Sequence, residues 1–161
     1  MKKIKLSQNQ VALIDNADFE YLNIFKWHAI KGHSTFYAIR NIRLANGRRT
    51  TILMHREILN PSKGIDIDHI NHCGLDNRRT NLRICTCQEN KRNGNSYKNS
   101  SSIFKGVSWH KNNKKWRADI RYNRKTKYLG CFLSETDAAL AYNNKAIELF
   151  GEFAKLNEII K

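Results

Sequence analysis

Residues 65–93 read IDIDHINHCGLDNRRTNLRICTCQENKRN, and this stretch decides how the rest of the chain is interpreted. Asp68 and His69 stand side by side in it. Asn81 follows twelve residues after the histidine, and Asn90 nine residues later. A carboxylate combined with carboxamides suits a hard divalent ion such as Mg²⁺, and an imidazole can take a proton from water near neutral pH. These are the parts needed to hydrolyse a phosphodiester.

The apolar pattern around these side chains predicts two short strands and a helix. A strand at the start of the stretch leads into a polar loop, and a second strand is expected at residues 82–85. Thr86, with Glu89 three residues later, forms a capping-box pattern, so we expect a helix to start near Thr86.

The chain of 161 residues has a net charge of +15, which points to a polyanionic partner, and nucleic acid is the usual one. Residues 98–127 contain ten Lys and Arg residues and one acid, Asp119. Arg78, Arg79 and Arg83, in and beside the polar loop, suit phosphate contacts, with a solvated basic face as the alternative. No basic amphipathic helix with a wide apolar face stands out, so a membrane partner is not expected.

No apolar run reaches membrane-spanning length, and the start of the chain lacks the apolar core of a signal peptide, so a cytoplasmic location is expected. Cysteines in that compartment are expected to be thiols. His72, Cys73, Cys85 and Cys87 could supply four zinc ligands, but they do not form pairs spaced by two to four residues. We therefore favour packed thiols, here and at Cys131, over a zinc site.

The composition divides the chain into four parts. Residues 1–60 form an α/β segment, 61–93 a core with the polar loop, 94–103 a small, polar linker, and 104–157 a final domain. In the first part, an apolar helix-like cluster at residues 19–27 follows the expected cap at Asp15 or Asn16. Strands are predicted at residues 36–42 and 50–54, separated by an Asn46-Gly47 turn.

The final domain reads as three strands followed by one helix. Strand-like runs occur at residues 107–109, 116–120 and 128–132, divided by polar turns. Ser134 is the expected cap of an amphipathic helix that ends at Gly151. The fold class predicted for the whole chain is α+β.

The spacing of Asp68, His69, Asn81 and Asn90, with LDNRRTNLRICT between them, resembles the HNH nuclease family. It is most similar to the phage homing-endonuclease branch, in which asparagine replaces the last histidine, and the upstream MHR at residues 54–56 also resembles that branch. The resemblance implies an N-terminal ββα-metal unit with one divalent metal, Mg²⁺ or Mn²⁺. Carried over by position, Asp68 and Asn90 would be metal ligands, His69 the general base, and Asn81 the residue that holds the loop and orients the histidine.

Three neighbouring side chains have open roles. Asp66 lies on the same strand face as Asp68 and could be an additional ligand, although a solvated acid is favoured. His72 could assist at the phosphate or bond to the backbone. His55 could contact phosphate or be packed in the interior.

The segment from Phe104 to Asn157, about 54 residues, resembles the APETALA/ethylene-response-factor type of DNA-binding domain. The motifs that carry the resemblance are FKGVSW from residue 104, KWRADIR from 115 and YLGCF from 128. The resemblance implies a three-stranded antiparallel sheet that lies in the major groove with one helix packed behind it. Matching positions and strand alternation give the DNA-contact candidates Lys105, Ser108, Trp116, Arg117, Asp119, Arg121 and Tyr128.

Two departures prevent base preference from being carried over. The family often has arginine where this chain has Ser108, and the first turn is one residue longer here. Core packing is the alternative role for Trp109 and Trp116.

Together these features predict a site-directed, divalent-metal-dependent DNA endonuclease that acts on double-stranded DNA, has no small-molecule substrate, and nicks as a monomer. If the chain is phage-encoded, it works in the bacterial host cytoplasm. The alternative is a catalytically inactive DNA-binding or regulatory protein on the same scaffold. An RNA-binding protein is a third possibility, but the stacking motifs of common RNA modules are missing.

Overall fold

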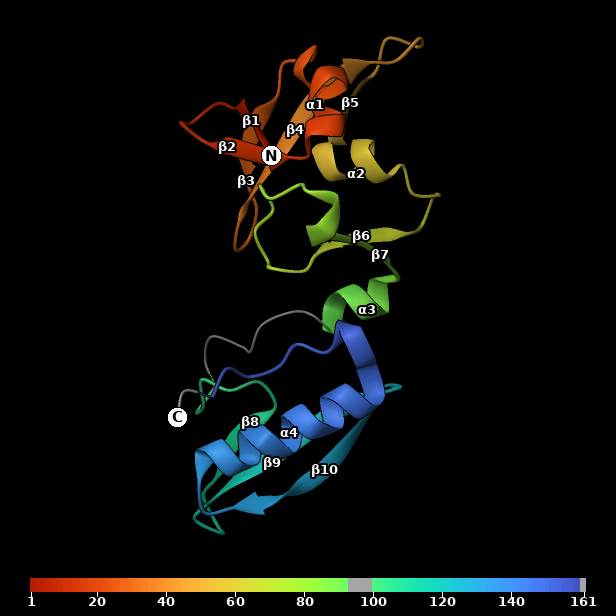
Figure 1. Ribbon diagram of the computed structural model, residues 1–161. Coiled ribbons are helices and arrows are strands. Elements are labelled where there is room, and N and C mark those ends of the chain that lie inside the picture. Colours follow the sequence, from red (N-terminus) through yellow and green to blue (C-terminus); the bar gives the residue numbers. More distant parts are fainter. Residues whose placement is uncertain (93–99, 160–161) are drawn as a thin grey trace. The chain divides into compact units, whose positions relative to one another are not determined.

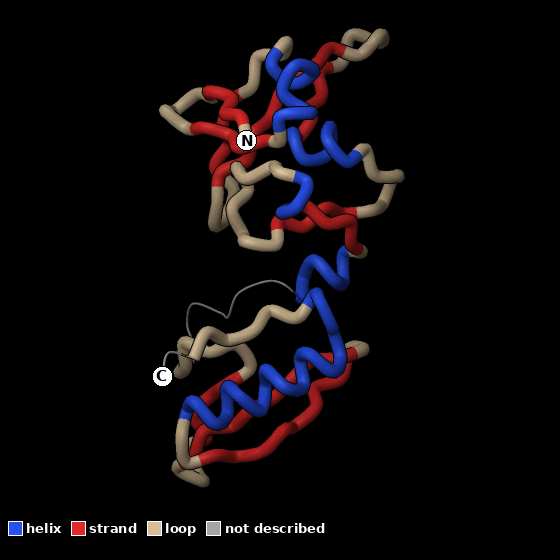
Figure 2. The backbone as a smooth tube through the Cα atoms, viewed as in Figure 1, coloured by secondary structure: helices blue, strands red, loops and turns tan. Residues whose placement is uncertain are grey.

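The computed structural model describes residues 1–92 and 100–159 (Figure 1). It has the predicted α+β class, with several small antiparallel sheets and few helices (Figure 2). The chain divides into two compact units, Met1–Cys87 and Gln88–Lys161. Residues 94–99 of the predicted linker lie outside the described residues. No helix in the described ranges is long and apolar enough to cross a membrane.

The first unit begins with an antiparallel hairpin of β1 (Lys2–Lys5) and β2 (Val11–Ile14), followed by α1 (Asn16–Asn23). Asp15 is the N-cap, as one of the two predicted caps. The helix ends at Asn23, before the end of the apolar cluster, and the indole Nε1 of Trp27 donates to the carbonyl of Leu22 at 2.8 Å. That bond satisfies a carbonyl near the end of the helix, where carbonyls lose their helical partners.

A three-stranded sheet follows in the order β3 (His28–Lys31), β4 (Phe36–Arg43) and β5 (Arg49–Leu53). The two strands predicted around the Asn46-Gly47 turn are confirmed as β4 and β5. Gly47 has φ of 79°, a value that glycine adopts without steric cost. Met54 begins α2 (Met54–Leu59) and does not extend the strand.

The stretch that carries the polar loop forms a second antiparallel hairpin, β6 (Asp66–His69) and β7 (Leu82–Cys85), as predicted. A short 3₁₀ turn, Arg79–Asn81, precedes β7, and α3 (Cys87–Arg92) begins one residue after the expected cap. Ile67 and Leu82 join the same hydrophobic core as residues from β1, β2, β4, α1 and α2. The polar loop is therefore held on a core that residues 1–60 largely supply.

The second unit contains the three predicted strands, β8 (Val107–His110), β9 (Lys115–Tyr122) and β10 (Lys125–Phe132), in the order β10-β9-β8. The predicted helix is α4 (Glu135–Phe150), which lies across one face of this sheet (Figure 1). Ser134 caps it by accepting bonds from the backbone N–H groups of Thr136 and Asp137. Val107, Ala118 and Ile120 on the sheet pack with buried residues of α4.

The end of the second unit is fastened by Asn157. Its side-chain Oδ1 accepts from the backbone N–H of Lys105 at 2.7 Å, and its Nδ2 donates to the carbonyl of Lys105 at 3.1 Å. Asn143 on α4 makes a reciprocal pair of bonds with the Asn157 backbone, at 2.7 and 2.9 Å. The side chain of Asn157 thus ties the segment after α4 to the start of the sheet.

We expect Asn157→Ala to lower the free energy of unfolding by roughly 2 kcal/mol, since two hydrogen bonds are lost and both backbone groups of Lys105 lose a partner. Urea unfolding of the full chain measures the effect. Asn157→Asp, which keeps the acceptor and loses the donor, should lie between the parent and the alanine variant. An unchanged unfolding midpoint for the alanine variant would show that the fastening contributes nothing.

Candidate functional site

The hairpin of β6 and β7 brings Asp68 opposite Arg83 in the strand register. Arg83 donates to Asp68 Oδ2 through Nη2 at 2.6 Å and through Nε at 2.9 Å. The two side chains are only 7% and 13% exposed, so water screens this ion pair weakly. The predicted metal ligand and a predicted DNA-contact arginine are therefore partners of each other in the free protein.

His69, at the end of β6, lies in a cluster of three rings. The His55 ring meets it edge to face, with 4.9 Å between ring centroids, and the Tyr37 ring lies 5.9 Å from His69 and 6.0 Å from His55. The three residues come from β6, α2 and β4, and both histidines are buried. Of the two roles left open for His55, the structure finds the packed one, whereas the place of Tyr37 beside His69 was not foreseen from the sequence.

Burial keeps both imidazoles of this cluster neutral. It lowers the pKa of His69, although Asn77 and the nearby carboxylates of Asp68 and Asp76 act in the opposite direction. Burial also lowers the pKa of His55 to about 3, and the positive charge of Arg56, with that of His69 when His69 is protonated, adds to the shift. At neutral pH the ring of His69 is therefore in the form that can accept a proton.

The loop between β6 and β7 is held together by Asn81. The Nδ2 of this buried side chain donates to the carbonyl of Asp76 at 2.7 Å, and its Oδ1 accepts from the backbone N–H of Asn71 at 3.0 Å. The polar atom found near the His69 ring belongs to a different residue, Asn77, whose Oδ1 lies 3.4 Å from Nε2 of His69. Asn81 contacts the loop and Asn77 contacts the histidine, so the two tasks predicted for Asn81 are divided between them.

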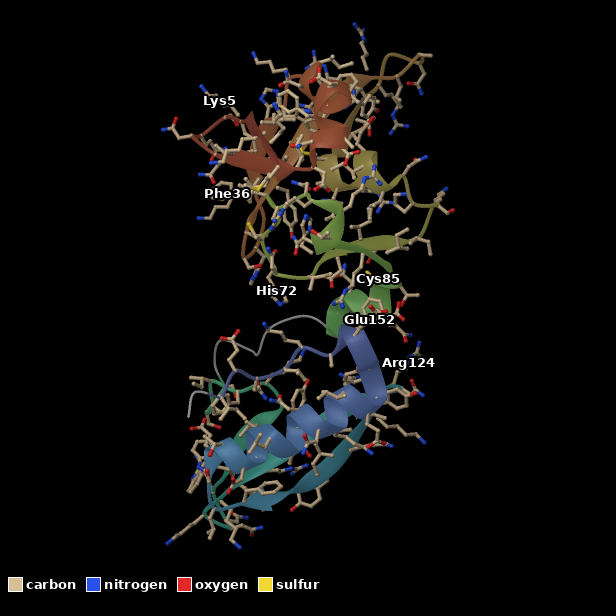
Figure 3. The ribbon with its side chains drawn as sticks, viewed as in Figure 1. Lys5, Phe36, His72, Cys85, Arg124 and Glu152 are labelled. Atoms are coloured by element: carbon tan, nitrogen blue, oxygen red, sulfur yellow. The ribbon has the colours of Figure 1, made fainter. Side chains whose placement is uncertain are left out.

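Asn77 is fully buried, and within residues 1–92 and 100–159 its Nδ2 has no hydrogen-bond partner. A buried amide nitrogen without a partner is costly, which makes this position notable beside a catalytic candidate. Its only sequence signal is its place in the polar loop, four residues before Asn81. His72 lies on the same loop and is labelled in Figure 3.

The loop arginines form intramolecular ion pairs. Arg78 binds Asp76 through two bonds of 2.6 and 2.7 Å, and these bonds lower the pKa of Asp76. Arg79 binds Asp18 of α1 at 2.7 Å and also donates to the carbonyl of Ile58. Like Arg83, both residues predicted to contact DNA already have carboxylate partners in the free protein.

The donors near Asp68 suit a hard cation better than a soft one. Asp68 provides a carboxylate, and Asp66 lies two residues earlier on the same strand. Within the described ranges, no group of three or more His, Cys, Asp or Glu side chains is arranged to hold a metal ion. An ion such as Mg²⁺ needs only one or two protein carboxylates, because water completes its coordination. Asn90 lies on α3, and its assignment as a ligand stays a prediction.

In the second unit, the outer face of the sheet carries most of the predicted contact residues. Arg117 pairs with Asp119 at 2.7 Å, and its guanidinium lies 5.4 Å from the centre of the Tyr128 ring. Ser108 pairs with Arg117 across β8 and β9, so the two side chains lie on the same face of the sheet. Arg121 is exposed and lies four residues after Arg117 on β9, which places it on that face too. These side chains alternate with Ala118 and Ile120, which face the core.

Two other residues of this unit that were predicted to contact DNA, Trp116 and Lys105, are partly buried. Trp116 packs against the core beside Ala118 and meets the ring of Trp109 at 5.1 Å. Trp109 itself is 40% exposed. Lys105 is half-buried, and burial together with the charge of Lys155 lowers its pKa to about 8.

Comparison with known proteins gives the family. No protein-family model matches the chain, and no solved structure matches it significantly. The chain is 38% identical over 58 residues to Protein 3.8 of Escherichia phage T7, which covers 36% of this chain and 48% of that protein. It is 37% identical over 136 residues to an uncharacterized HNH endonuclease of Acanthamoeba polyphaga mimivirus, which covers 84% of this chain and 68% of the relative. At that identity over most of both chains, the protein belongs to the HNH endonucleases.

Proposed function

We propose that this protein is a divalent-metal-dependent endonuclease that cleaves double-stranded DNA at a recognised site, with His69 as general base. One observation carries the proposal: a buried, neutral imidazole directly follows the carboxylate of Asp68 on β6, in a chain of the HNH endonuclease family. A general base near the scissile phosphate removes a proton from the attacking water.

The contact with Asn77 favours one tautomer of His69. When Oδ1 of Asn77 accepts a hydrogen bond, Nε2 of His69 carries the proton and Nδ1 has the free lone pair. The rings of His55 and Tyr37 restrict rotation of the imidazole, which holds that nitrogen in one direction. His69 is thus the proton acceptor, while Asn77, His55 and Tyr37 position it.

Asp68 would hold the divalent ion, Mg²⁺ or Mn²⁺, and Asn90 is the second ligand predicted from the sequence. The ion's contribution is to neutralise charge on the phosphate and on the leaving oxygen. Arg83 balances the buried charge of Asp68 in the free protein, which avoids an isolated carboxylate in a poorly hydrated place.

The second unit is proposed as the part that selects the target. Its segment 104–157 would act as an APETALA/ethylene-response-factor-like domain, joined through the linker 94–103 to the nuclease core of residues 61–93 and the segment 1–60. Arg121, Tyr128 and the Arg117–Asp119 pair present polar and aromatic groups on the face opposite α4. Linking a binding module to a cutting module raises the local concentration of the cutter at the bound site.

A catalytically inactive DNA-binding protein is the alternative, and metal removal separates the two. Purified protein incubated with supercoiled phage or host DNA and Mg²⁺ should produce open circles, because one site per chain nicks one strand. Addition of a chelator should stop nicking while gel shifts still show bound DNA. Bound DNA that is never nicked with Mg²⁺ or Mn²⁺ would favour the inactive alternative, and nicking that continues in chelator would refute metal dependence.

A further inference from the structure

The hairpin between β4 and β5 carries three exposed arginines, Arg43, Arg48 and Arg49. We call residues 43–49 the hairpin tip, and Figure 1 shows it reaching out from the body of the first unit. The surrounding sequence, residues 21–56, contains seven Lys and Arg residues and no Asp or Glu. No acid close in sequence can therefore neutralise the tip.

The arginines of the tip differ from five other arginines of the described residues, which have carboxylate partners. Carboxylates bind the guanidinium groups of Arg40, Arg78, Arg79, Arg83 and Arg117. Within residues 1–92 and 100–159, the three tip arginines form no salt bridge. Arg43 donates through Nε to the carbonyl of Gly47 at 3.4 Å, which orients the side chain without cancelling its charge.

The strand register adds a second observation. Arg43 and Arg49 are direct partners in the antiparallel pair of β4 and β5, so their side chains share one face of the hairpin. Like charges directly opposite each other destabilise a sheet. This unfavourable pair becomes favourable once an anion lies between or over the two guanidinium groups, because arginine binds phosphate through strong, paired hydrogen bonds.

The same strand connects the tip to the catalytic rings. Tyr37, near the start of β4, contacts the rings of His55 and His69, and Arg43 ends the strand. Arg43 is six positions after Tyr37, which is about 20 Å at the rise of an extended strand. Along a DNA strand, with phosphates about 3.4 Å apart, this distance corresponds to about six base pairs.

We propose that the hairpin tip binds the phosphate backbone of duplex DNA within about six base pairs of the position that the His69 site cuts. The placement of the contact rests on the function proposed above. A two-stranded ribbon is narrow enough to follow a groove of duplex DNA, and three unneutralised arginines suit the phosphates that border it. The contact would hold the cutting end of the protein on DNA independently of the second unit.

Salt dependence of binding tests the contact without any cleavage. The triple variant carries Arg43→Gln, Arg48→Gln and Arg49→Gln. For its binding to duplex DNA, the slope of log affinity against log salt concentration should be shallower by about 2 to 3, since each phosphate contact contributes about 0.9 to that slope. Anisotropy titrations in chelator measure it. The matched control replaces the exposed residues Lys3, Lys5 and Lys26 by glutamine, which removes the same charge from the same unit. Equal slopes for the triple variant and the control would overturn the proposal.

Arg49→Glu gives a test in which stability and binding move in opposite directions. An acid opposite Arg43 replaces repulsion with attraction, so the thermal unfolding midpoint should rise while DNA affinity falls. If the variant loses stability together with affinity, damaged folding explains the lower DNA affinity. If the affinity is unchanged, the tip does not touch DNA. Either result overturns the proposal.

The location and the catalytic proposal can be judged separately. Hydroxyl-radical footprints of the parent and the triple variant, on DNA whose cut position is mapped, should differ within about six base pairs of the cut. Protection lost only farther away would overturn the placement. A shallow slope for the triple variant in a protein that never cuts would retain the backbone contact and refute the nuclease function. If the parent cuts normally and its slope equals that of the triple variant, the nuclease function is retained and the backbone contact is refuted.

Discussion

His69→Ala is expected to reduce the single-turnover rate of DNA cleavage by a factor of roughly 10² to 10⁴, the usual contribution of a general base. In the proposed mechanism the imidazole of His69 is the proton acceptor. The other imidazole of the ring cluster, His55, accepts protons poorly, because burial lowers its pKa to about 3. DNA affinity in chelator should change little, because His69 is only 6% exposed and contributes little of the surface that can meet DNA.

The pH dependence of cleavage gives a second measurement on the same residue. Burial lowers the pKa of His69 below the ordinary value of about 6.5, so the neutral base should persist into mildly acid solution. The cleavage rate of the parent should fall only below that value as pH decreases. The exposed histidine His33 supplies the control, and His33→Ala should cut like the parent. A His69→Ala variant that cuts at the parent's rate would remove this residue from the mechanism.

The largest expected effect on stability comes from His55. Its pKa is about 3 in the folded chain, against an ordinary value of about 6.5, so the unfolded chain binds the proton more readily. The loss of unfolding free energy from His55 is therefore absent above pH 6.5 and grows as pH falls toward 3. At pH 4 the parent should have lost roughly 3 kcal/mol of unfolding free energy through this group alone.

His55→Phe isolates that effect, because the ring can still pack against Tyr37 and His69 but cannot take a proton. Urea unfolding of the parent and the variant, measured between pH 7 and pH 4, should show a stability difference that shifts in the variant's favour as pH falls. His33→Phe, at an exposed position, should follow the parent's curve. Parallel curves for the parent and His55→Phe would mean that His55 is not held neutral by folding.

Local patterns predicted most of the secondary structure. The β4 and β5 strands flank an Asn-Gly turn, Ser134 and Gly151 bound α4, and alternation marks β9, so each signal is contained within a few neighbouring residues. β1, β2 and β3 were not predicted, and KKIK and HAIK carry little strand signal, so β1 and β3 depend on pairing with β2 and β4. Strand preference is largely a property of such neighbours.

The surroundings of His69, the proposed general base, show the same contrast between local signals and packing. The adjacent Asp68 and His69 and the loop-holding bonds of Asn81 concern residues close together in the chain, and the motif spacing contained that information. Tyr37 and His55 are 32 and 14 residues away from His69, and only packing brings the three rings together. The contact of Asn77 with His69 was also missed, because several polar side chains of one loop are equivalent until the loop has a conformation.

The charged residues separate what the sequence determined from what only the tertiary structure decided. The sequence by itself determined which chemical groups are present: a carboxylate beside an imidazole on one predicted strand, and an excess of positive charge that points to a polyanion. Only the tertiary structure decided which arginines keep that charge available. Arg79 is neutralised by Asp18, 61 residues away. Arg43 and Arg49 face each other, and neither forms a salt bridge within the described residues. Ion pairing depends on distance in space, and folding alone sets that distance for residues far apart in the chain.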